Sequence, residues 1–169
     1  MKIELKQWRQ HEEDKEALIR ICNDVRLRSY IRNRLPFPYM MEDAEWFIGH
    51  AMEEDGKTGI YRAVVVDDVY VGNISVEQRD DVYCKSAELG YMLDYAYWSK
   101  GIMTKAAGMA CDLGFSQLDI VRIEGSVCEP NIGSRRVLEK NGFKLEGTLK
   151  KAVYKNGEYY DYCIYGLVR

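Results

Sequence analysis

The residues with the clearest chemical potential surround Gly101, where the apolar pattern changes from that of a strand to that of a helix. Residues 88–93 are typical of a strand, whereas apolar residues recur at helical spacing from Ile102 onward. The first N–H groups of a helix have no carbonyl partner within it, and together with the helix dipole they favour an anion. The stretch 98–104 is therefore a candidate anion site, although an ordinary turn glycine before a helix has the same local sequence.

A second motif begins at Asn131 and contains Ser134 three residues later. Asn131 follows Pro130 and has the character of a helix N-cap, and the helix expected at 132–141 ends at Asn141-Gly142, a left-handed cap signal. Ser134 would then lie in the first helical turn. From its position alone, Ser134 is either a solvent-facing serine or a hydroxyl presented to a bound group.

The two motifs together resemble those of the GCN5-related N-acetyltransferases (GNAT), and most closely the ribosomal-protein N-terminal (RimJ/RimL-type) branch of that family. The resemblance is carried by 98–104 and by Asn-x-x-Ser at 131–134 followed by Glu-Lys-Asn-Gly-Phe at 139–143. Trp98 stands where the family commonly has Gln or Arg, and Met103 where it has a small residue. Neither departure removes a backbone donor.

The resemblance implies acetyl-coenzyme A (acetyl-CoA) as cosubstrate, with no metal. Its diphosphate would bind the amides at the start of the helix, with the Lys100 ammonium adding charge. The strand that bears residues 91–93 would part from the strand 121–128, and a backbone N–H near Leu93 would stabilise the charge on the thioester oxygen. The predicted cofactor-binding residues are Tyr91, Met92, Leu93, Ser99, Lys100, Gly101, Ile102, Met103, Thr104, Asn131 and Ser134.

Two residues are candidates for catalysis. Many family members place a tyrosine near the leaving sulfur, but this chain has Leu138 there. In the ribosomal branch the serine of Asn-x-x-Ser approaches the sulfur, which points to Ser134. Some ribosomal enzymes carry a carboxylate at the position of Val153, so Glu88 on the central strand is the next candidate for the general base. The alternative for Glu88 is a structural carboxylate paired with a neighbouring strand.

The apolar patterns predict a mixed α+β fold, and the resemblance gives it the GNAT arrangement: a mostly antiparallel sheet of about six to seven strands, splayed at its centre, with about four helices. Asn156-Gly157 is the strongest turn signal in the chain. The expected strands are 2–8, 60–66, 69–76, 84–93, 121–128, 143–153 and 159–168, and the expected helices are 14–23, 41–55, 101–117 and 132–141.

Composition limits the remaining classes of protein. A chain of 169 residues with 47% hydrophobic and 30% charged residues suits a single domain, 1–169, with one well-buried core. No apolar run is long enough to span a membrane and no secretory segment is evident, so a cytoplasmic location is expected. Two histidines and scattered cysteines favour reduced thiols over a metal site or a thiol nucleophile. The cysteines are Cys22, Cys84, Cys111, Cys128 and Cys163.

The net charge of −3 gives no general attraction to nucleic acid. A local run of arginines is interpreted as a solvated helix face rather than an RNA site. Its members are Arg20, Arg26, Arg28, Arg32 and Arg34.

The acceptor is left open. Loops 26–45 and 154–161 are expected to set its identity, and Tyr159, Tyr160 and Asp161 either border its pocket or form cross-strand pairs. The favoured acceptor is the amine of a protein N-terminus. The alternatives are a small-molecule amine, such as a polyamine, an amino sugar or an antibiotic, and a catalytically silent acyl-CoA-binding domain. The tyrosine-rich last strand also suggests a homodimer.

Overall fold

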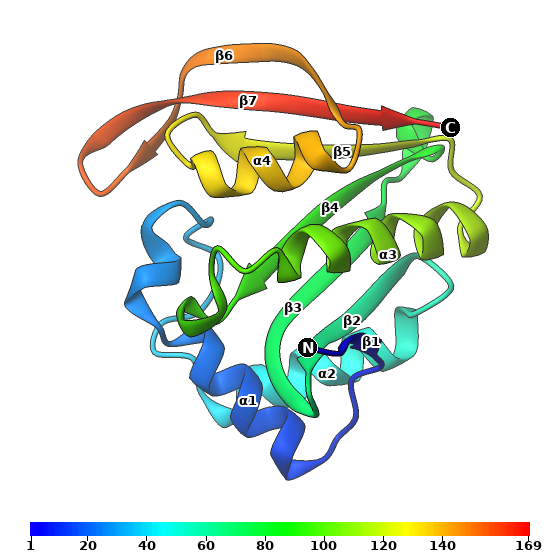
Figure 1. The fold of residues 1–169 in the computed structure, drawn as a ribbon, viewed down its shortest axis with the longest axis vertical. Coiled ribbons are helices and arrows are strands. Elements are labelled where there is room, and N and C mark those ends of the chain that lie inside the picture. The colour runs from blue at the N-terminus through cyan, green and yellow to red at the C-terminus, as the bar shows by residue number, and fades with distance from the viewer.

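The polypeptide is built around one seven-stranded sheet with helices on both faces (Figure 1). The computed structural model describes residues 1–169. The helices are α1 (Glu12–Cys22), α2 (Met41–Glu54), α3 (Ile102–Gln117) and α4 (Ile132–Lys140), with short 3-10 helices η1 (Val25–Ser29), η2 (Asp81–Tyr83) and η3 (Tyr95–Tyr97). The strands are β1 (Ile3–Lys6), β2 (Gly59–Val66), β3 (Val69–Gln78), β4 (Ser86–Leu93), β5 (Arg122–Cys128), β6 (Lys144–Lys155) and β7 (Glu158–Val168).

The sheet is splayed at its only parallel pair. The strand order is β1-β2-β3-β4-β5-β7-β6, and every neighbouring pair is antiparallel except β4 and β5. Those two strands pair only where Ser86–Glu88 meets Arg122–Glu124. Beyond Glu88 they diverge, as Figure 1 shows, and we call the unpaired region between residues 89–93 and 125–128 the wedge. The predicted mixed, splayed sheet is thereby confirmed.

Side chains of β2 alternate between two cores, which explains why this strand is buried along its whole length. Ile60, Val64 and Val66 pack in the cluster that contains α3 and Leu138 of α4. Ala63 and Val65 pack with α1 and α2 in a second cluster on the other face. Because strand side chains point alternately to opposite faces, a strand covered by helices on both sides is buried at odd and even positions alike. Arg62, the one charged residue of β2, pairs with Asp55. α3 and α4 therefore cover the same face of the sheet (Figure 1).

Several predicted boundaries were wrong by a few residues. The strand predicted at 84–93, β4, begins at Ser86 rather than at residue 84, because η2 turns the chain immediately before it. The first helix begins at Glu12, where three acidic residues occupy the first turn and complement the helix dipole. The strand predicted at 143–153 continues to Lys155, after a bulge between Leu149 and Val153.

The arginines at 20–34 do not share one helix face, contrary to the expectation. They are distributed over α1, η1 and the loop after it, and most of them bind neighbouring groups of the chain. Arg20 pairs with Asp94 and Arg26 pairs with Asp24. No helix of the fold combines the length and apolar character needed to cross a bilayer.

Candidate active site

The start of α3 presents unpaired backbone donors. Its first hydrogen bond runs from the Lys105 N–H to the Gly101 carbonyl (3.2 Å), so the three preceding amides, of residues 102–104, have no partner within the helix. Gly101 has a φ of 74°, in the left-handed region that favours glycine, and a Cβ there would meet nothing within 4 Å. No acidic side chain lies in the first turn. The predicted anion site is therefore an open helix start with uncompensated positive potential.

Trp98 has a structural function at this site. Its indole Nε1 donates to the Leu93 carbonyl at 2.8 Å and so fixes the end of β4 to the loop that precedes α3. Lys100, which we expected to add charge, folds back so that its ammonium donates to the Ala96 carbonyl (2.9 Å) and lies 5.3 Å from the centre of the Tyr97 ring. In this arrangement the Lys100 side chain is directed to the turn at η3.

The backbone of β4 offers groups to the wedge at alternate residues. The Asp94 N–H donates to the Val71 carbonyl (2.7 Å), and Tyr91 and Leu93 lie opposite Ile74 and Gly72 of β3. Because backbone groups in an antiparallel pair point alternately toward the partner and away from it, those of Tyr91 and Leu93 point away from β3. Their amides therefore face the wedge.

Ser134 lies against a tyrosine from the opposite wall of the wedge. The Tyr91 hydroxyl is 2.8 Å from Ser134 Oγ and donates to the Ser134 carbonyl oxygen at 3.1 Å. The Asn131 side chain accepts from the Ser134 N–H (3.3 Å), so Asn131 is the N-cap of α4. The contact between Tyr91 and Ser134 links β4 to α4. Ser134 is therefore no free solvent-facing serine.

Burial determines the protonation state of Tyr91. Desolvation raises the pKa of its phenol from 10.0 to about 12, against the opposing effect of the hydrogen bond with Ser134. The phenol therefore stays neutral at ordinary pH. It is a much weaker acid than a thiol, whose pKa is about 8.5, so Tyr91 is suited to orient a hydroxyl and is unsuited to give up its own proton to a thiolate.

Leu138 cannot replace the missing family tyrosine, because it belongs to the core. Its side chain is 1% exposed and packs on Gly125 of β5. A Cβ at Gly125 would lie 2.6 Å from a Leu138 methyl carbon. This glycine therefore permits the close approach of α4 to β5 that places Ser134 beside Tyr91.

Glu88 is occupied by arginines. It is the last residue of β4 that pairs with β5, and its carboxylate accepts from Arg32 at 2.8 Å and lies 3.7 Å from Arg79. Its neighbours Ala87 and Leu89 belong to the core beneath α3, so Glu88 faces the other side of the sheet. This geometry favours the structural alternative. The role of Glu88 as a base stays a prediction.

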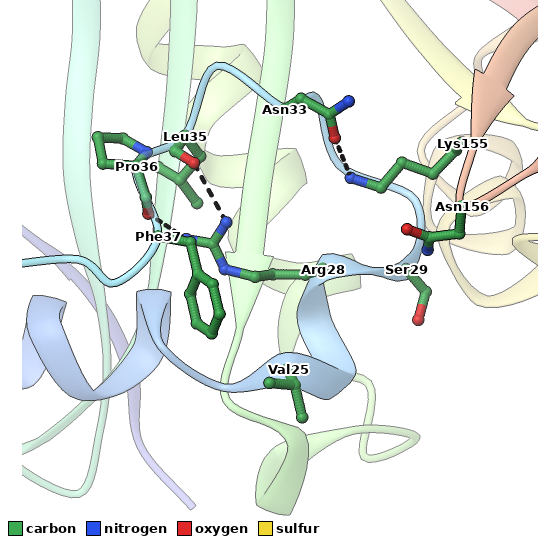
Figure 2. A pocket seen from close by; sticks show the side chains of 9 residues that line it. All are labelled: Val25, Arg28, Ser29, Asn33, Leu35, Pro36, Phe37, Lys155 and Asn156. Atoms are coloured by element: carbon green, nitrogen blue, oxygen red, sulfur yellow. Dashed lines mark hydrogen bonds between the residues drawn. The ribbon is translucent and has the colours of Figure 1, made fainter.

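The two loops that we expected to set acceptor identity meet in space. Lys155 donates from its ammonium to the Ile31 carbonyl (2.9 Å) and to Asn33 Oδ1 (2.6 Å), and the ring of Tyr30 packs edge-on against Tyr160 (5.8 Å). Between the loops lies a pocket of about 480 Å³, bounded by η1 and the following loop on one side and by the β6–β7 turn on the other (Figure 2). Phe37 is exposed and lines it.

The other residues of the last hairpin divide between the two expected roles. Tyr159 stacks on Tyr154 directly across the hairpin at 5.0 Å, so it forms a cross-strand pair. Asp161 accepts from the Lys151 N–H (2.9 Å) and from the Lys150 ammonium (3.1 Å). These contacts, led by the backbone hydrogen bond, lower the pKa of the Asp161 carboxyl and hold the bulge in β6. Of the three residues, Tyr160 alone reaches the 30–33 loop.

The structure brings most of the predicted cofactor residues to the wedge or to the start of α3, and the exceptions are Met92 and the side chain of Lys100. The Met92 side chain packs on the core formed with α1 and α2. Its backbone groups point to β3, because those of its neighbours Tyr91 and Leu93 point to the wedge. Pattern reasoning missed the roles of Trp98 and Arg32. The only signal in the sequence was an aromatic residue at a position where the family has a polar one.

Comparison with known proteins identifies the family of this chain. The acetyltransferase (GNAT) domain matches residues 2–144. The chain therefore belongs to the GNAT acetyltransferase family. A probable N-acetyltransferase of Bacillus subtilis, YjcK, is 39% identical over 116 residues, which cover 69% of this chain and 63% of that protein. The match thus spans less than two thirds of that relative's length.

Solved structures share the fold over nearly the whole chain. A RimL ribosomal L7/L12 alpha-N-protein acetyltransferase in complex with coenzyme A has a TM-score of 0.84 at 23% identity, and the match covers 98% of this chain and 93% of the other. A spermidine N-acetyltransferase from Vibrio cholerae in complex with CoA and spermine has a TM-score of 0.80 at 19% identity, with 98% and 95% covered. Proteins with different acceptors therefore share this fold, and the fold does not name the acceptor.

Proposed function

We propose that this protein is an acetyl-CoA-dependent N-acetyltransferase that transfers the acetyl group directly to a primary amine. The observation that carries the proposal is the wedge beyond Glu88, with unpaired amides of α3 at one end and the Ser134 hydroxyl on its wall. A polyanionic diphosphate suits the helix start, and an extended pantetheine arm suits strand backbone that has no partner strand.

Each part of the cosubstrate has a proposed contact. The amides of residues 99–104 bind the diphosphate, and the amides of Tyr91 and Leu93 face the pantetheine and the thioester oxygen, where negative charge develops as the amine attacks. The neutral amine adds to the thioester carbonyl, its nitrogen gives up one proton to solvent water, and the carbon–sulfur bond then breaks to release the thiolate of coenzyme A. Ser134 then donates its one hydroxyl proton in a hydrogen bond to that sulfur, and in this state the Tyr91 phenol donates to Ser134 Oγ and orients it.

We propose a protein N-terminus as the acceptor, in keeping with the Asn-x-x-Ser motif at 131–134. The pocket between the 25–37 loop and the β6–β7 turn supports this choice, because it is open at the surface and can admit the end of a chain. A small-molecule amine is the alternative. A second alternative is a silent acyl-CoA-binding domain, because Leu138 occupies the tyrosine position and Glu88 is bound by an arginine.

Release of free thiol from acetyl-CoA tests the three readings. The protein is incubated with acetyl-CoA and, in separate reactions, with short peptides, spermidine, an amino sugar or no acceptor. Peptide-dependent thiol release with a mass gain of one acetyl group on the N-terminus supports the proposal. Turnover with the small amines alone supports the alternative. Tight cofactor binding without turnover above hydrolysis identifies a silent domain.

A further inference from the structure

The pocket between the 25–37 loop and the β6–β7 turn carries positive charge on both walls. Arg28 projects from the η1 side and Lys155 from the β6–β7 hairpin (Figure 2). The other lining residues include Ser29, Asn33 and Asn156, and none of the nine residues that line the pocket is acidic. The walls therefore contribute two cations and no carboxylate.

Both cations are held in place by neutral groups. The Arg28 guanidinium donates to the carbonyls of Cys22 and Leu35 (3.1 Å each) and to that of Pro36, and it stacks 4.4 Å from the centre of the Phe37 ring. The Lys155 ammonium donates to the Ile31 carbonyl and to Asn33. A guanidinium has five N–H groups and an ammonium three, so each cation retains donors beyond these contacts. Their orientation is fixed, but their charge is not neutralised.

Nearby cations differ in this respect. Arg26 pairs with Asp24 at 2.6 Å and Arg32 pairs with Glu88 at 2.8 Å, so the charge of each is balanced by a carboxylate. Arg28 and Lys155 have no carboxylate within 4.0 Å. Arg28 and Lys155 thus bring into the pocket positive charge that no carboxylate of the chain pairs with.

The pocket adjoins the centre of the sheet. Asn33 lines it, and the preceding residue, Arg32, reaches from the same loop to Glu88, where β4 and β5 begin to separate. Contact with Tyr162 and the charge of Glu88 raise the pKa of the Arg32 guanidinium, so this link stays charged. The pocket is thus connected through Arg32 to the residue at which the wedge begins.

We propose that this pocket selects acceptors that carry an anionic group, a carboxylate or a phosphate, near the amine. The inference rests on the proposed function and deepens it, because it names the acceptor class as an acidic peptide N-terminus rather than a polycation. A polyamine would bring further positive charge between Arg28 and Lys155, with no carboxylate to receive it. An acidic residue close to the N-terminus would meet the remaining donors of both cations.

A peptide series of equal length tests the proposal. The peptides share a free N-terminus and differ at the second and third residues, which are Glu, phosphoserine, Gln or Lys, and spermidine is assayed beside them. We expect kcat/KM to be about tenfold higher for the acidic peptides than for the Gln peptide, and lower still for the Lys peptide and spermidine. The preference should shrink as salt is raised. The Glu and phosphoserine arms distinguish the two kinds of anion.

A charge-reversing variant makes the test specific to the pocket. Lys155→Glu should invert the order of the Glu and Lys peptides, and Lys155→Gln, which keeps a donor for the Ile31 carbonyl, should remove the preference. Lys144→Glu, the same change at an exposed position at the other end of β6, is the matched control and should leave the order unchanged. Equal rates for all peptides, or an order unaffected by Lys155→Glu, overturn the inference while leaving the acetyltransferase proposal intact. Absence of turnover with every acceptor overturns both.

Discussion

The hydroxyl of Tyr91 lies 2.8 Å from Oγ of Ser134, and this contact connects β4 to α4 across the wedge. Tyr91 also donates to the Ser134 carbonyl, so the phenol holds the first turn of α4 at two atoms. Since burial keeps the phenol neutral, the pair can orient a serine hydroxyl without changing the charge of the site.

If Tyr91 acts through Ser134, the two variants will not be additive. We expect Ser134→Ala to lower kcat by about 100-fold with little change in the KM for acetyl-CoA, and Tyr91→Phe to lower it by about tenfold. In the Ser134→Ala background, Tyr91→Phe should have almost no further effect. Steady-state kinetics on the four proteins measures the coupling. Additive losses would show that Tyr91 has a structural role only, and Tyr159→Phe, on the exposed hairpin, is the control.

The raised pKa of Tyr91 predicts how stability depends on alkaline pH. In the unfolded chain the phenol ionises near pH 10, but in the folded protein near pH 12, so its stabilising effect is complete below pH 10 and is lost as pH rises toward 12. Chemical denaturation at pH 9 to 12 should therefore show a steeper loss of stability for the wild type than for Tyr91→Phe. Identical slopes would contradict the burial of this phenol.

Gly101→Ala tests the anion site. A non-glycine residue at a φ of 74° costs about 1 kcal/mol, which will tilt or fray the first turn of α3. We expect acetyl-CoA affinity, measured by calorimetry, to fall by about fivefold, a change of similar size to that strain. Gly133→Ala in α4, where a Cβ also meets open space and the φ is not positive, should bind normally. Unchanged affinity in Gly101→Ala would place the diphosphate elsewhere.

The close contact of Gly125 with Leu138 predicts that a substitution at Gly125 lowers activity although it does not touch Tyr91 or Ser134. Gly125→Ala puts a methyl group 2.6 Å from Leu138 and should displace α4, lowering the free energy of unfolding by about 1–3 kcal/mol and also lowering kcat. Shortening the partner in the double variant Gly125→Ala, Leu138→Val should restore part of the activity lost in Gly125→Ala. If kcat does not recover, the packing of Leu138 on Gly125 does not determine where Ser134 lies.

Asp14 is a stability determinant outside the site. It is completely buried and accepts from the Arg9 backbone N–H (2.9 Å) and side chain (2.8 Å). Asp14→Ala should lower the free energy of unfolding by about 2–3 kcal/mol, because it leaves these donors without an acceptor. The exposed pair of Asp119 with Lys85 provides the comparison, and Asp119→Ala should cost less than about 1 kcal/mol. Urea denaturation measures both.

Local patterns in the sequence determined most of the elements and the position of the anion site. The change of period at Gly101, the Asn131 cap and the Asn156-Gly157 turn depend on neighbouring residues alone, so they could be predicted without tertiary information. The family motifs added the splayed sheet. Boundaries failed where a 3-10 helix or a bulge intervened, as at Ser86 and Lys155, because those features carry no periodic signal.

Tertiary structure alone decided the partners of the functional groups. Tyr91 and Ser134 are 43 residues apart in the chain, and Asn33 and Lys155 are 122 residues apart. The sequence presented Glu88 as a base or a structural carboxylate, and the fold placed it beside Arg32. Such contacts depend on how the strands are ordered and how closely α4 approaches β5. These are properties of packing between distant segments, and no local pattern of residues encodes them.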